Sequence, residues 1–474
     1  MLFNSIEFLI FFPIVIAGFF LLPHRFRRYF LLAASCYFYM SFIPKYIFIL
    51  LFTTLVDYFG ALGVEKAREI GNRKLSKACF LTAVLLNVGL LVFFKYLGLL
   101  EDTINFFGHM IDMKTVVLPD VVLPIGISFH TFQSMGYLID VFMGKEKAEK
   151  SFIDFALFLM FFPQLVAGPI ERSSNLFSQL KEEHFIKYEN FSYGGKMMLW
   201  GMFKKVVVAD NLAMFADAVF NNVESYSGGG LILGILAFTI QIYCDFSGYS
   251  DIAIGAAKCM DINLMKNFDT PYFSRSVPEF WRRWHISLST WFKDYVYIPM
   301  GGNRVPKLRW ALNILTVWML TGLWHGAEWT FVLWGLYFAF FLVLEKALAR
   351  VIAKIPPVLN RILVLFIVMI SFMIFDSPTI SEAFRRIVTL FDFTNPADTV
   401  SLYYMRSYAG TLAAAIIGAT PLLRDTARKL AASESRTVQT VMNVLVPVFV
   451  CAVLIVSTAY LVDGSYNPFL YFRF

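Results

Sequence analysis

The sequence predicts an all-α membrane protein that crosses a bilayer many times, and three observations lead to this fold class. Hydrophobic residues make up 58% of the 474 residues and charged residues only 16%, whereas soluble domains average about 45–50% and about 25%. The mean hydropathy is +0.63. Apolar runs near the ~20 residues that span a bilayer recur along the whole chain. This composition excludes a soluble enzyme and a disordered protein.

The predicted membrane segments follow these apolar runs. Some runs are too short to cross alone, so about ten to thirteen transmembrane and re-entrant helices are expected. The first run lacks the basic flank and cleavage site of a signal peptide, which predicts a retained helix. Without an internal repeat or a low-complexity linker, one membrane domain is expected over residues 1–474. The runs are 3–22, 30–42, 46–64, 79–100, 116–141, 152–168, 199–220, 231–257, 310–323, 327–348, 359–375, 403–423 and 441–462.

Loop charges predict the orientation of the first half. The loops after the first, third and fifth runs are basic, and the loops between them are short or acidic. The positive-inside rule therefore places the N-terminus outside and the basic loops in the cytoplasm. The net charge of +7 is assigned in this way to contacts with membrane lipids, and nucleic acid is not expected as a partner.

Residues 274–310 break the apolar pattern. They combine many charged side chains with Trp281, Trp284 and Trp291. The stretch is therefore too charged to lie in lipid and too aromatic for an ordinary solvated loop. Charged backbone at membrane depth is tolerated where protein buries it or where it lines a watery cavity. We expect interfacial and re-entrant segments on the cytoplasmic side. A plain amphipathic helix on lipid headgroups is the alternative.

His325 is the first candidate for chemistry, because it lies between two strongly apolar runs. Burying an ionisable ring there is costly without a partner or a wet cavity, and imidazole suits proton transfer near neutral pH. Gly322 and Gly326 leave space beside the ring, as an approaching substrate or a bent helix requires. On these residues alone, a catalytic histidine and a core histidine bonded to a backbone carbonyl stay equally open.

The other five histidines divide into two groups. His285 lies in the charged aromatic stretch, and together with His325 it could act as base and orienting donor. His130 could line the same cavity, but packing within a helix is favoured. No third His, Cys or paired carboxylate has metal-ligand spacing, so no metal is expected. Three lie in polar connections and are expected to be incidental: His24, His109 and His184.

Other polar groups in apolar surroundings have structural interpretations. Asp245 and Asp251 are about 600° apart on a helix and cannot form one pair. Asp245 is expected to be the structural partner of an arginine or a histidine. Gln164 marks a broken helix end or a membrane-edge turn. The five cysteines are scattered and predict no disulfide framework, and there is no phosphate loop or serine-hydrolase elbow.

Two blocks carry a family resemblance. WRRWHISLSTWFKDYVYIPMGGNR at 281–304 and LTGLWHG at 320–326 resemble the signature of the membrane-bound O-acyltransferase (MBOAT) family. More narrowly, they are similar to its bacterial branch of alginate O-acetylation membrane proteins, which also holds peptidoglycan O-acetylating relatives and D-alanyl transferases of teichoic acids. Residues 245–251 and 162–172 match as well, so the resemblance covers essentially the whole chain.

The resemblance implies a ring of tilted helices around a central tunnel. It implies catalysis by His325, with His285 as the second histidine of the same passage. The donor would be a cytoplasmic acyl thioester such as acetyl-CoA, with no bound cofactor, and a hydroxyl would accept the acyl group. Six further residues are implied as tunnel or supporting residues: Trp324, Asp245, Asp294, Asn303, Gln164 and His130.

The chain ends in an aromatic motif, residues 465–474. It is similar to the terminal motif of the alginate-type branch, which implies that Tyr471 relays the acyl group; an aromatic interface anchor is the alternative. The implied partners are a periplasmic SGNH-fold acetyltransferase and a polysaccharide acceptor, alginate-like or peptidoglycan, at the bacterial inner membrane. D-alanyl transfer to teichoic acid and a transporter remain rivals, although the two similar halves of many transporters are not visible.

Overall fold

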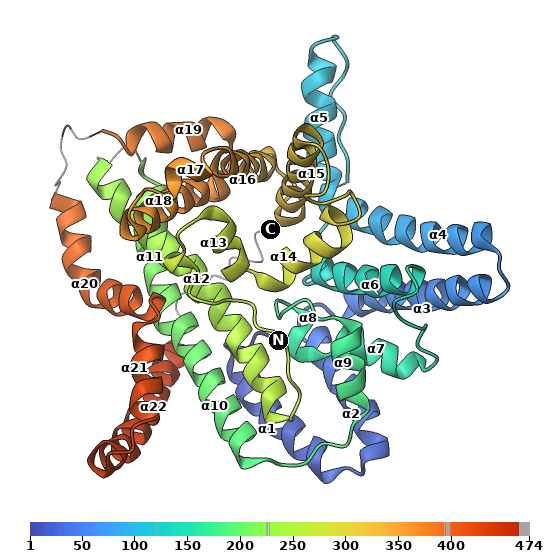
Figure 1. The fold of residues 1–474 in the computed structure, drawn as a ribbon, viewed down its shortest axis with the longest axis horizontal. Coiled ribbons are helices and arrows are strands. Elements are labelled where there is room, and N and C mark those ends of the chain that lie inside the picture. Colours follow the sequence, from blue (N-terminus) through green and yellow to red (C-terminus); the bar gives the residue numbers. More distant parts are fainter. Residues whose placement is uncertain (120, 224–225, 227, 393, 395–398, 464–474) are drawn as a thin grey trace. The chain divides into compact units, whose positions relative to one another are not determined.

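The computed structural model describes residues 1–119, 121–223, 226, 228–392, 394 and 399–463. Within these residues it is built from helices and turns and contains no strand (Figure 1). The predicted all-α class is therefore confirmed. The chain divides into two compact units: Met1–Gly195 with Ala253–Met265, and Lys196–Ile252 with the described chain from Lys266 on. The single membrane domain expected from the sequence stays a prediction.

In the described part of the chain, six helical stretches are long and apolar enough to cross a bilayer by themselves, as expected for a multi-pass membrane protein. A shorter apolar helix, α1 (Ile6–Leu21), comes before them. The total of about ten to thirteen membrane segments stays a prediction. The six stretches are Pro44–Glu69, Arg73–His109, Gly228–Cys259, Trp329–Ala347, Pro357–Asp376 and Arg436–Asp463.

In the first unit, local sequence signals set where helices begin. The helices after α1 are α2 (His24–Met40), α3 (Ile47–Glu69), α4 (Arg73–Leu91), α5 (Leu97–His109), α6 (Ile127–Phe142), α7 (Phe152–Met160), α8 (Phe162–Leu165) and α9 (Ser173–Lys181). Ser5 caps α1 by accepting a hydrogen bond from the N–H of Phe8 at 3.2 Å, and Asn72 caps α4 through the N–H of Leu75 at 3.0 Å. Such caps satisfy N–H groups that the first helical turn leaves free.

Two predicted runs of the first unit are not continuous helices. The run 116–141 is wrong in its first half, because α6 begins only at Ile127. Pro119 and Pro124 interrupt the apolar sequence, and Gly126 takes a left-handed φ of 76° just before the helix, so a helix cannot extend through these residues. The run 152–168 is split into α7 and α8, which are too short to cross a bilayer.

The predicted run 79–100 belongs to a longer helical stretch, Arg73–His109. A π-helical turn, η2 (Val92–Tyr96), joins α4 to α5. Figure 1 shows α5 leaving the direction of α4 at this turn. π-turns are among the ordinary causes of such a bend.

The second unit begins within α10 (Tyr188–Met202). The elements that follow are η3 (Phe203–Ala209), α11 (Asp210–Phe220), α12 (Gly228–Cys259), α13 (Val277–Arg283), α14 (Ile286–Phe292), η6 (Lys293–Tyr297), α15 (Lys307–His325), α16 (Trp329–Ala347), α17 (Ala349–Ile352), α18 (Pro357–Asp376), α19 (Ile380–Thr389), α20 (Thr399–Ala419), α21 (Leu422–Ala431) and α22 (Arg436–Asp463). Its hydrophobic core joins side chains of α11, α12, α13, α15, α16 and α18.

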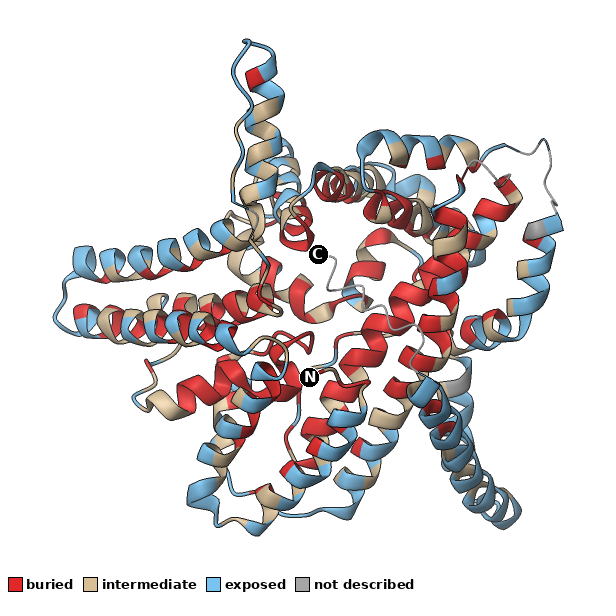
Figure 2. Ribbon diagram, turned by 180° about the vertical axis from the view of Figure 1, so that it is seen from behind, coloured by how far each residue is buried: buried red, intermediate tan, exposed pale blue. Residues whose placement is uncertain are grey.

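The spans of the second unit differ greatly in burial. In its most apolar part, α12 is 78% buried, whereas α22 is 11% buried. Figure 2 shows this contrast, with α12 mainly red and α22 mainly pale blue. Within residues 274–310, α13 and α14 have seven residues each, so neither can cross a bilayer. The re-entrant, cytoplasmic placement of this stretch stays a prediction.

Candidate active site

His325 is the last residue of α15, and a tight pairing of α15 with α16 fixes its position. A Cβ atom on Gly322 would stand 2.2 Å from the carbonyl oxygen of Phe331, and one on Gly335 would stand 2.2 Å from that of Trp318. The two backbones therefore touch where these glycines face each other. Small residues at helix contacts permit such a close approach in membrane proteins.

The glycines beside His325 serve this packing. A Cβ atom on Gly326 would stand 2.0 Å from the Phe331 ring, and α15 ends at His325 because Gly326 is extended, with φ −161° and ψ 160°. The space that the sequence suggested for an approaching substrate or a bend is filled by Phe331 at Gly326. At Gly322, the space is filled by the backbone of α16, which packs against α15 there.

Aromatic side chains surround His325, which is 6% exposed. The centroid of its ring lies 4.9 Å from that of Trp334 and 5.5 Å from that of Phe375. Trp324, the preceding residue, lies at 5.0 Å. This low-dielectric enclosure strengthens any electrostatic interaction that the imidazole makes.

His285 lies next to the same enclosure, as the sequence suggested. Its ring centroid is 6.5 Å from that of His325 and 5.8 Å from that of Trp324. Phe246 of α12 packs against it at 4.8 Å. The structure thus brings together three residues of the expected site, His325, His285 and Trp324, which lie up to forty positions apart in the sequence. Two imidazoles at this separation can both reach one reacting group.

His285 is held in a rare conformation. It precedes α14 with φ 43° and ψ 55°, in the left-handed region, which costs about 1–3 kcal/mol for a residue other than glycine. Its Nδ1 atom lies 3.2 Å from Oδ1 of the buried Asn267. The residue is outside the six candidate spans, and its complete burial lowers the pKa of His285 to about 3, so the ring is neutral at physiological pH. Asn267 was missed by the sequence analysis, because nothing in its polar loop marks it.

Asp245 has a buried cation as its partner, but this cation is a lysine and not the arginine or histidine that was expected. Lys205 Nζ lies 2.8 Å from Asp245 Oδ1 and 2.7 Å from Asp210 Oδ1. Its side chain is completely buried. Asp251, as predicted, does not pair with Asp245; it pairs with Lys204 at 2.5 Å. A signal for Lys205 was present, since an ionisable residue within an apolar run is rarely incidental.

The remaining candidate residues that the structure describes in the second unit are less buried than the two histidines. Asp294 is partly buried in η6. Asn303 is exposed in a turn where Gly301 and Gly302 have φ angles of 99° and 54°. Asn313 donates to the carbonyl of Gly302 at 3.2 Å and anchors this turn. Tyr471 and the motif 465–474 lie outside the described residues.

Gln164 and His130 belong to the first unit. Gln164 is buried in α8, where its Nε2 donates to the carbonyl oxygen of Phe158. His130 is buried in α6, with Nε2 2.8 Å from the hydroxyl of Thr53 in α3. Both side chains tie helices of this unit together. Gln164 thus lies in the short helix α8 directly after the break at Phe161, and His130 packs α6 against α3; the tunnel or supporting roles implied for both stay predictions.

Two cavities differ in the side chains that line them. One of about 410 Å³ is mostly apolar and is lined by α13, α14, η6 and α15, with Trp281, Ile286 and the basic residues Arg282 and Lys293. Trp281 contacts Trp334, with ring centroids 5.6 Å apart, so one aromatic layer connects this cavity with His325. Among the described residues, no group of three or more His, Cys, Asp or Glu side chains could hold a metal ion.

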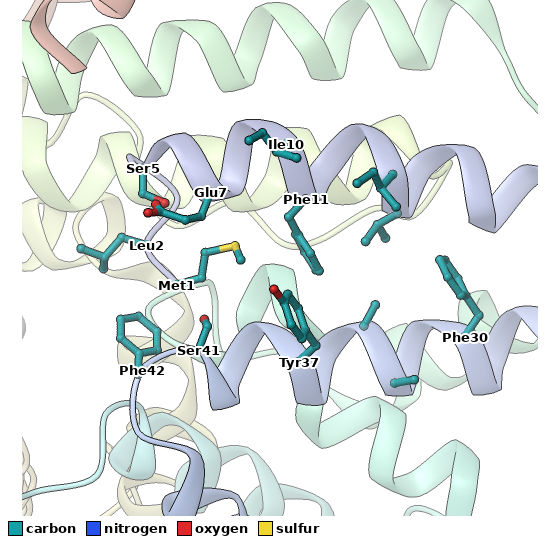
Figure 3. Close-up of a pocket in the computed structure, with 14 residues that line it drawn as sticks. Met1, Leu2, Ser5, Glu7, Ile10, Phe11, Phe30, Tyr37, Ser41 and Phe42 are labelled. Atoms are coloured by element: carbon teal, nitrogen blue, oxygen red, sulfur yellow. The ribbon is translucent and has the colours of Figure 1, made fainter. Parts of the chain in front are cut away.

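The other cavity, of about 830 Å³, lies between α1 and α2 in the first unit. Figure 3 shows Phe11 and Tyr37 facing each other across it. Its lining is mostly apolar and includes none of the predicted site residues. Because it holds none of these residues, we do not assign the acyl chemistry to it.

Comparisons with known proteins agree with this geometry. The model of the family described as MBOAT, membrane-bound O-acyltransferase family, matches residues 118–379. The "Probable alginate O-acetylase AlgI" of Azotobacter vinelandii is 34% identical over 506 aligned positions, which cover all of both chains. The peptidoglycan O-acetyltransferase of Helicobacter pylori is 33% identical over 81% of this chain and 79% of its own. The teichoic acid D-alanyltransferase of Streptococcus thermophilus is more distant: it is 30% identical over 48% of this chain and 57% of its own.

The apolar helices, the family model and these relatives together identify a multi-pass membrane enzyme, an O-acyltransferase. The chain belongs to the membrane-bound O-acyltransferase family.

Proposed function

We propose that the protein transfers an acetyl group from a cytoplasmic thioester, acetyl-CoA, for the O-acetylation of an extracytoplasmic polysaccharide. One observation carries the proposal: His325 and His285 share one aromatic enclosure, with ring centroids 6.5 Å apart. The full-length similarity to a relative named for alginate O-acetylation supports an alginate-like exopolysaccharide as the final acceptor. The protein would act in the bacterial cytoplasmic membrane.

In the proposed reaction, His325 is the general base. It removes the proton of the acceptor hydroxyl as the hydroxyl oxygen attacks the thioester carbonyl. A C–O bond forms, the C–S bond breaks, and the proton passes from the imidazole to the departing thiolate. General base catalysis of this kind is typically worth about 10²–10⁴-fold in rate. The surrounding aromatic side chains keep water, a competing acceptor, away from the thioester.

The cavity lined by Arg282 and Lys293, which reaches Ile286 next to His285, is our proposed entrance for the donor. Its volume of about 410 Å³ suits an acylated pantetheine arm rather than a whole coenzyme. Trp281 and Trp318 offer an apolar wall, and Arg282 and Lys293 offer positive charge for phosphate groups. The cytoplasmic side predicted for residues 274–310 agrees with a donor made in the cell.

The acetyl group must then leave the cytoplasmic side. We propose that Tyr471 accepts it as an acyl-tyrosine and that a periplasmic SGNH-fold acetyltransferase passes it to the polysaccharide. Tyr471→Phe keeps an aromatic ring and removes the nucleophile. Loss of polymer acetylation in this variant, measured by acetyl content, is expected; unchanged acetylation would show that Tyr471 is only an interface anchor.

The central experiment compares His325→Ala with wild-type protein, purified and supplied with radiolabelled acetyl-CoA. Loss of acetyl transfer is expected, with normal membrane insertion and an unchanged elution profile. His24→Ala is the matched control, because His24 is an exposed histidine at the start of α2. Wild-type turnover by His325→Ala would overturn the assignment of the base.

The same assay separates the rival functions. A transporter would neither hydrolyse the thioester nor transfer its acetyl group. A D-alanyl transferase would ignore acetyl-CoA and use a D-alanyl carrier protein. Either result would reject the proposed reaction. Acetylation of peptidoglycan rather than an alginate-like polymer would leave the donor chemistry intact and correct only the acceptor.

A further inference from the structure

Asn267 is a buried amide whose hydrogen bonds determine its orientation. Its Oδ1 accepts from the backbone N–H of Ser287 at 3.3 Å and from the hydroxyl of Ser287 at 3.0 Å. Its Nδ2 donates to the hydroxyl of Ser250 in α12 at 3.3 Å. A backbone N–H can only donate, so the atom facing Ser287 must be the amide oxygen. A flipped amide would set its NH₂ group against the N–H of Ser287, donor against donor, whereas the Ser287 hydroxyl can adapt to either orientation.

This orientation also determines the tautomer of His285. The Nδ1 atom of His285 lies 3.2 Å from the same Oδ1, and an amide oxygen carries no hydrogen. The proton of the neutral ring must therefore be on Nδ1, which leaves the lone pair on Nε2. The low pKa caused by burial keeps this ring neutral, so its Nε2 can accept a hydrogen bond but cannot donate one.

Asn267 supports the backbone of His285 as well as its ring. The carbonyl oxygen of Asn267 accepts from the N–H of Ile286 at 3.0 Å. With the bond from the N–H of Ser287, this ties both residues after His285 to Asn267. A left-handed residue other than glycine persists only where its surroundings over-determine it. Asn267 supplies these constraints through its main chain and its side chain.

We propose that Asn267 is a positioning residue, which holds His285 as its Nδ1–H tautomer so that Nε2 accepts a hydrogen bond from an amide N–H of the acylated pantetheine arm. This inference rests on the acyltransfer reaction proposed above. It removes one possibility that the sequence left open, in which His285 is an orienting donor. The two histidines then have separate roles: His285 holds the donor arm through its lone pair, and His325 takes the single proton of the acceptor hydroxyl.

The surroundings of His285 make a charge test possible. The ring contacts named above are with one other imidazole, His325, and with the uncharged side chains of Phe246, Trp324 and Asn267. Asn267 in turn bonds the hydroxyls of Ser250 in α12 and Ser287 in α14. Asn267→Asp would place a carboxylate against Nδ1–H, and a nearby negative charge favours imidazolium. The protonated ring has no lone pair on Nε2.

The experiment measures acetyl transfer from acetyl-CoA between pH 5 and 9 for wild type, Asn267→Asp, and Asn221→Asp. Asn221 is exposed after α11 and provides the same charge change away from the ring. The acid limb of the profile is expected to move to higher pH in Asn267→Asp alone, with about tenfold loss for each pH unit below the new pKa. A slower variant with an unshifted profile would reduce Asn267 to a structural residue and overturn the proposal.

A second measurement does not depend on activity and reads the tautomer in the wild-type protein itself. ¹⁵N spectra of histidine-labelled wild-type protein distinguish protonated from unprotonated ring nitrogens, and His285→Asn assigns the signals. A protonated Nδ1 and an unprotonated Nε2 are expected for His285. The opposite tautomer would overturn the inference even if acetyl transfer is confirmed. If the expected tautomer is found but the protein does not transfer acetyl groups, Asn267 remains the residue that orients His285, and only the proposed reaction is rejected.

Discussion

Replacing Gly322 by alanine should inactivate the protein without unfolding it. The added methyl group would stand 2.2 Å from the carbonyl oxygen of Phe331, whereas ordinary contact begins at 3.4 Å. The obstacle is the backbone of α16, which cannot rotate away as a side chain would. α16 must therefore retreat by about 1 Å, and a misplacement of this size can reduce an enzymatic rate about 10²-fold.

The retreat acts directly on the candidate site. Trp334 of α16 lies against His325, with ring centroids 4.9 Å apart, so it moves with the helix and loosens the enclosure. The overpacking itself costs about 1–3 kcal/mol, partly offset by up to ~1 kcal/mol of better helix propensity. The expected result is about a hundredfold lower acetyl transfer with only a small fall in the thermal midpoint.

The assay is transfer from radiolabelled acetyl-CoA, with thermal unfolding in detergent measured on the same samples. Gly89→Ala is the matched control, since Gly89 lies within α4 and a Cβ atom there meets nothing within 4 Å. Both variants gain helix propensity, but only Gly322→Ala meets a backbone. Wild-type transfer by Gly322→Ala would refute the reasoning that the α15–α16 contact positions His325.

Two further predictions concern buried or paired charges. Lys205→Met leaves Asp210 and Asp245 without their shared cation and should lower the stability by about 3–5 kcal/mol; a thermal midpoint equal to wild type would contradict this. Burial alone raises the pKa of Asp261, but hydrogen bonds from Lys187 and from His184 outweigh it and hold the pKa below its ordinary value of 3.8. The resulting stabilisation is present above pH 3.8 and is lost as the pH falls through the lower pKa of the folded protein. The wild type should therefore lose more stability than Asp261→Asn between pH 5 and 3. Parallel plots of stability against pH for the two proteins would exclude the effect.

Hydropathy predicted the long helices well because lipid demands long apolar segments. It failed at residues 116–126, where the apolar residues are present but Pro119 and Pro124 prevent a helix. Mean hydropathy stays high when two prolines stand among many apolar residues, so it does not reveal that the helix is interrupted. It also could not find the π-turn at η2, because an average over many residues does not change when one residue is added to a helical turn.

Site residues could be predicted from the sequence where their residue type is unusual for its surroundings. His325 and His285 stand out as ionisable rings in apolar or aromatic surroundings, and the structure brings them together. Asn267 does not stand out, because its role arises from contacts with residues 17 to 20 positions away, which only the folded chain creates. Lys205 lies between these cases: its burial was foreseeable, but its two carboxylate partners were not.

The unequal burial of the spans has a consequence for how each one can vary. The side chains of α22 mostly face outward, so one aliphatic residue can replace another there with little effect. α12 is surrounded by protein, and its polar residues, such as Thr239, Gln241 and Ser250, escape the hydrocarbon for that reason. Among natural variants, α22 should therefore accept many exchanges of one apolar residue for another, whereas α12 should tolerate few substitutions along most of its length.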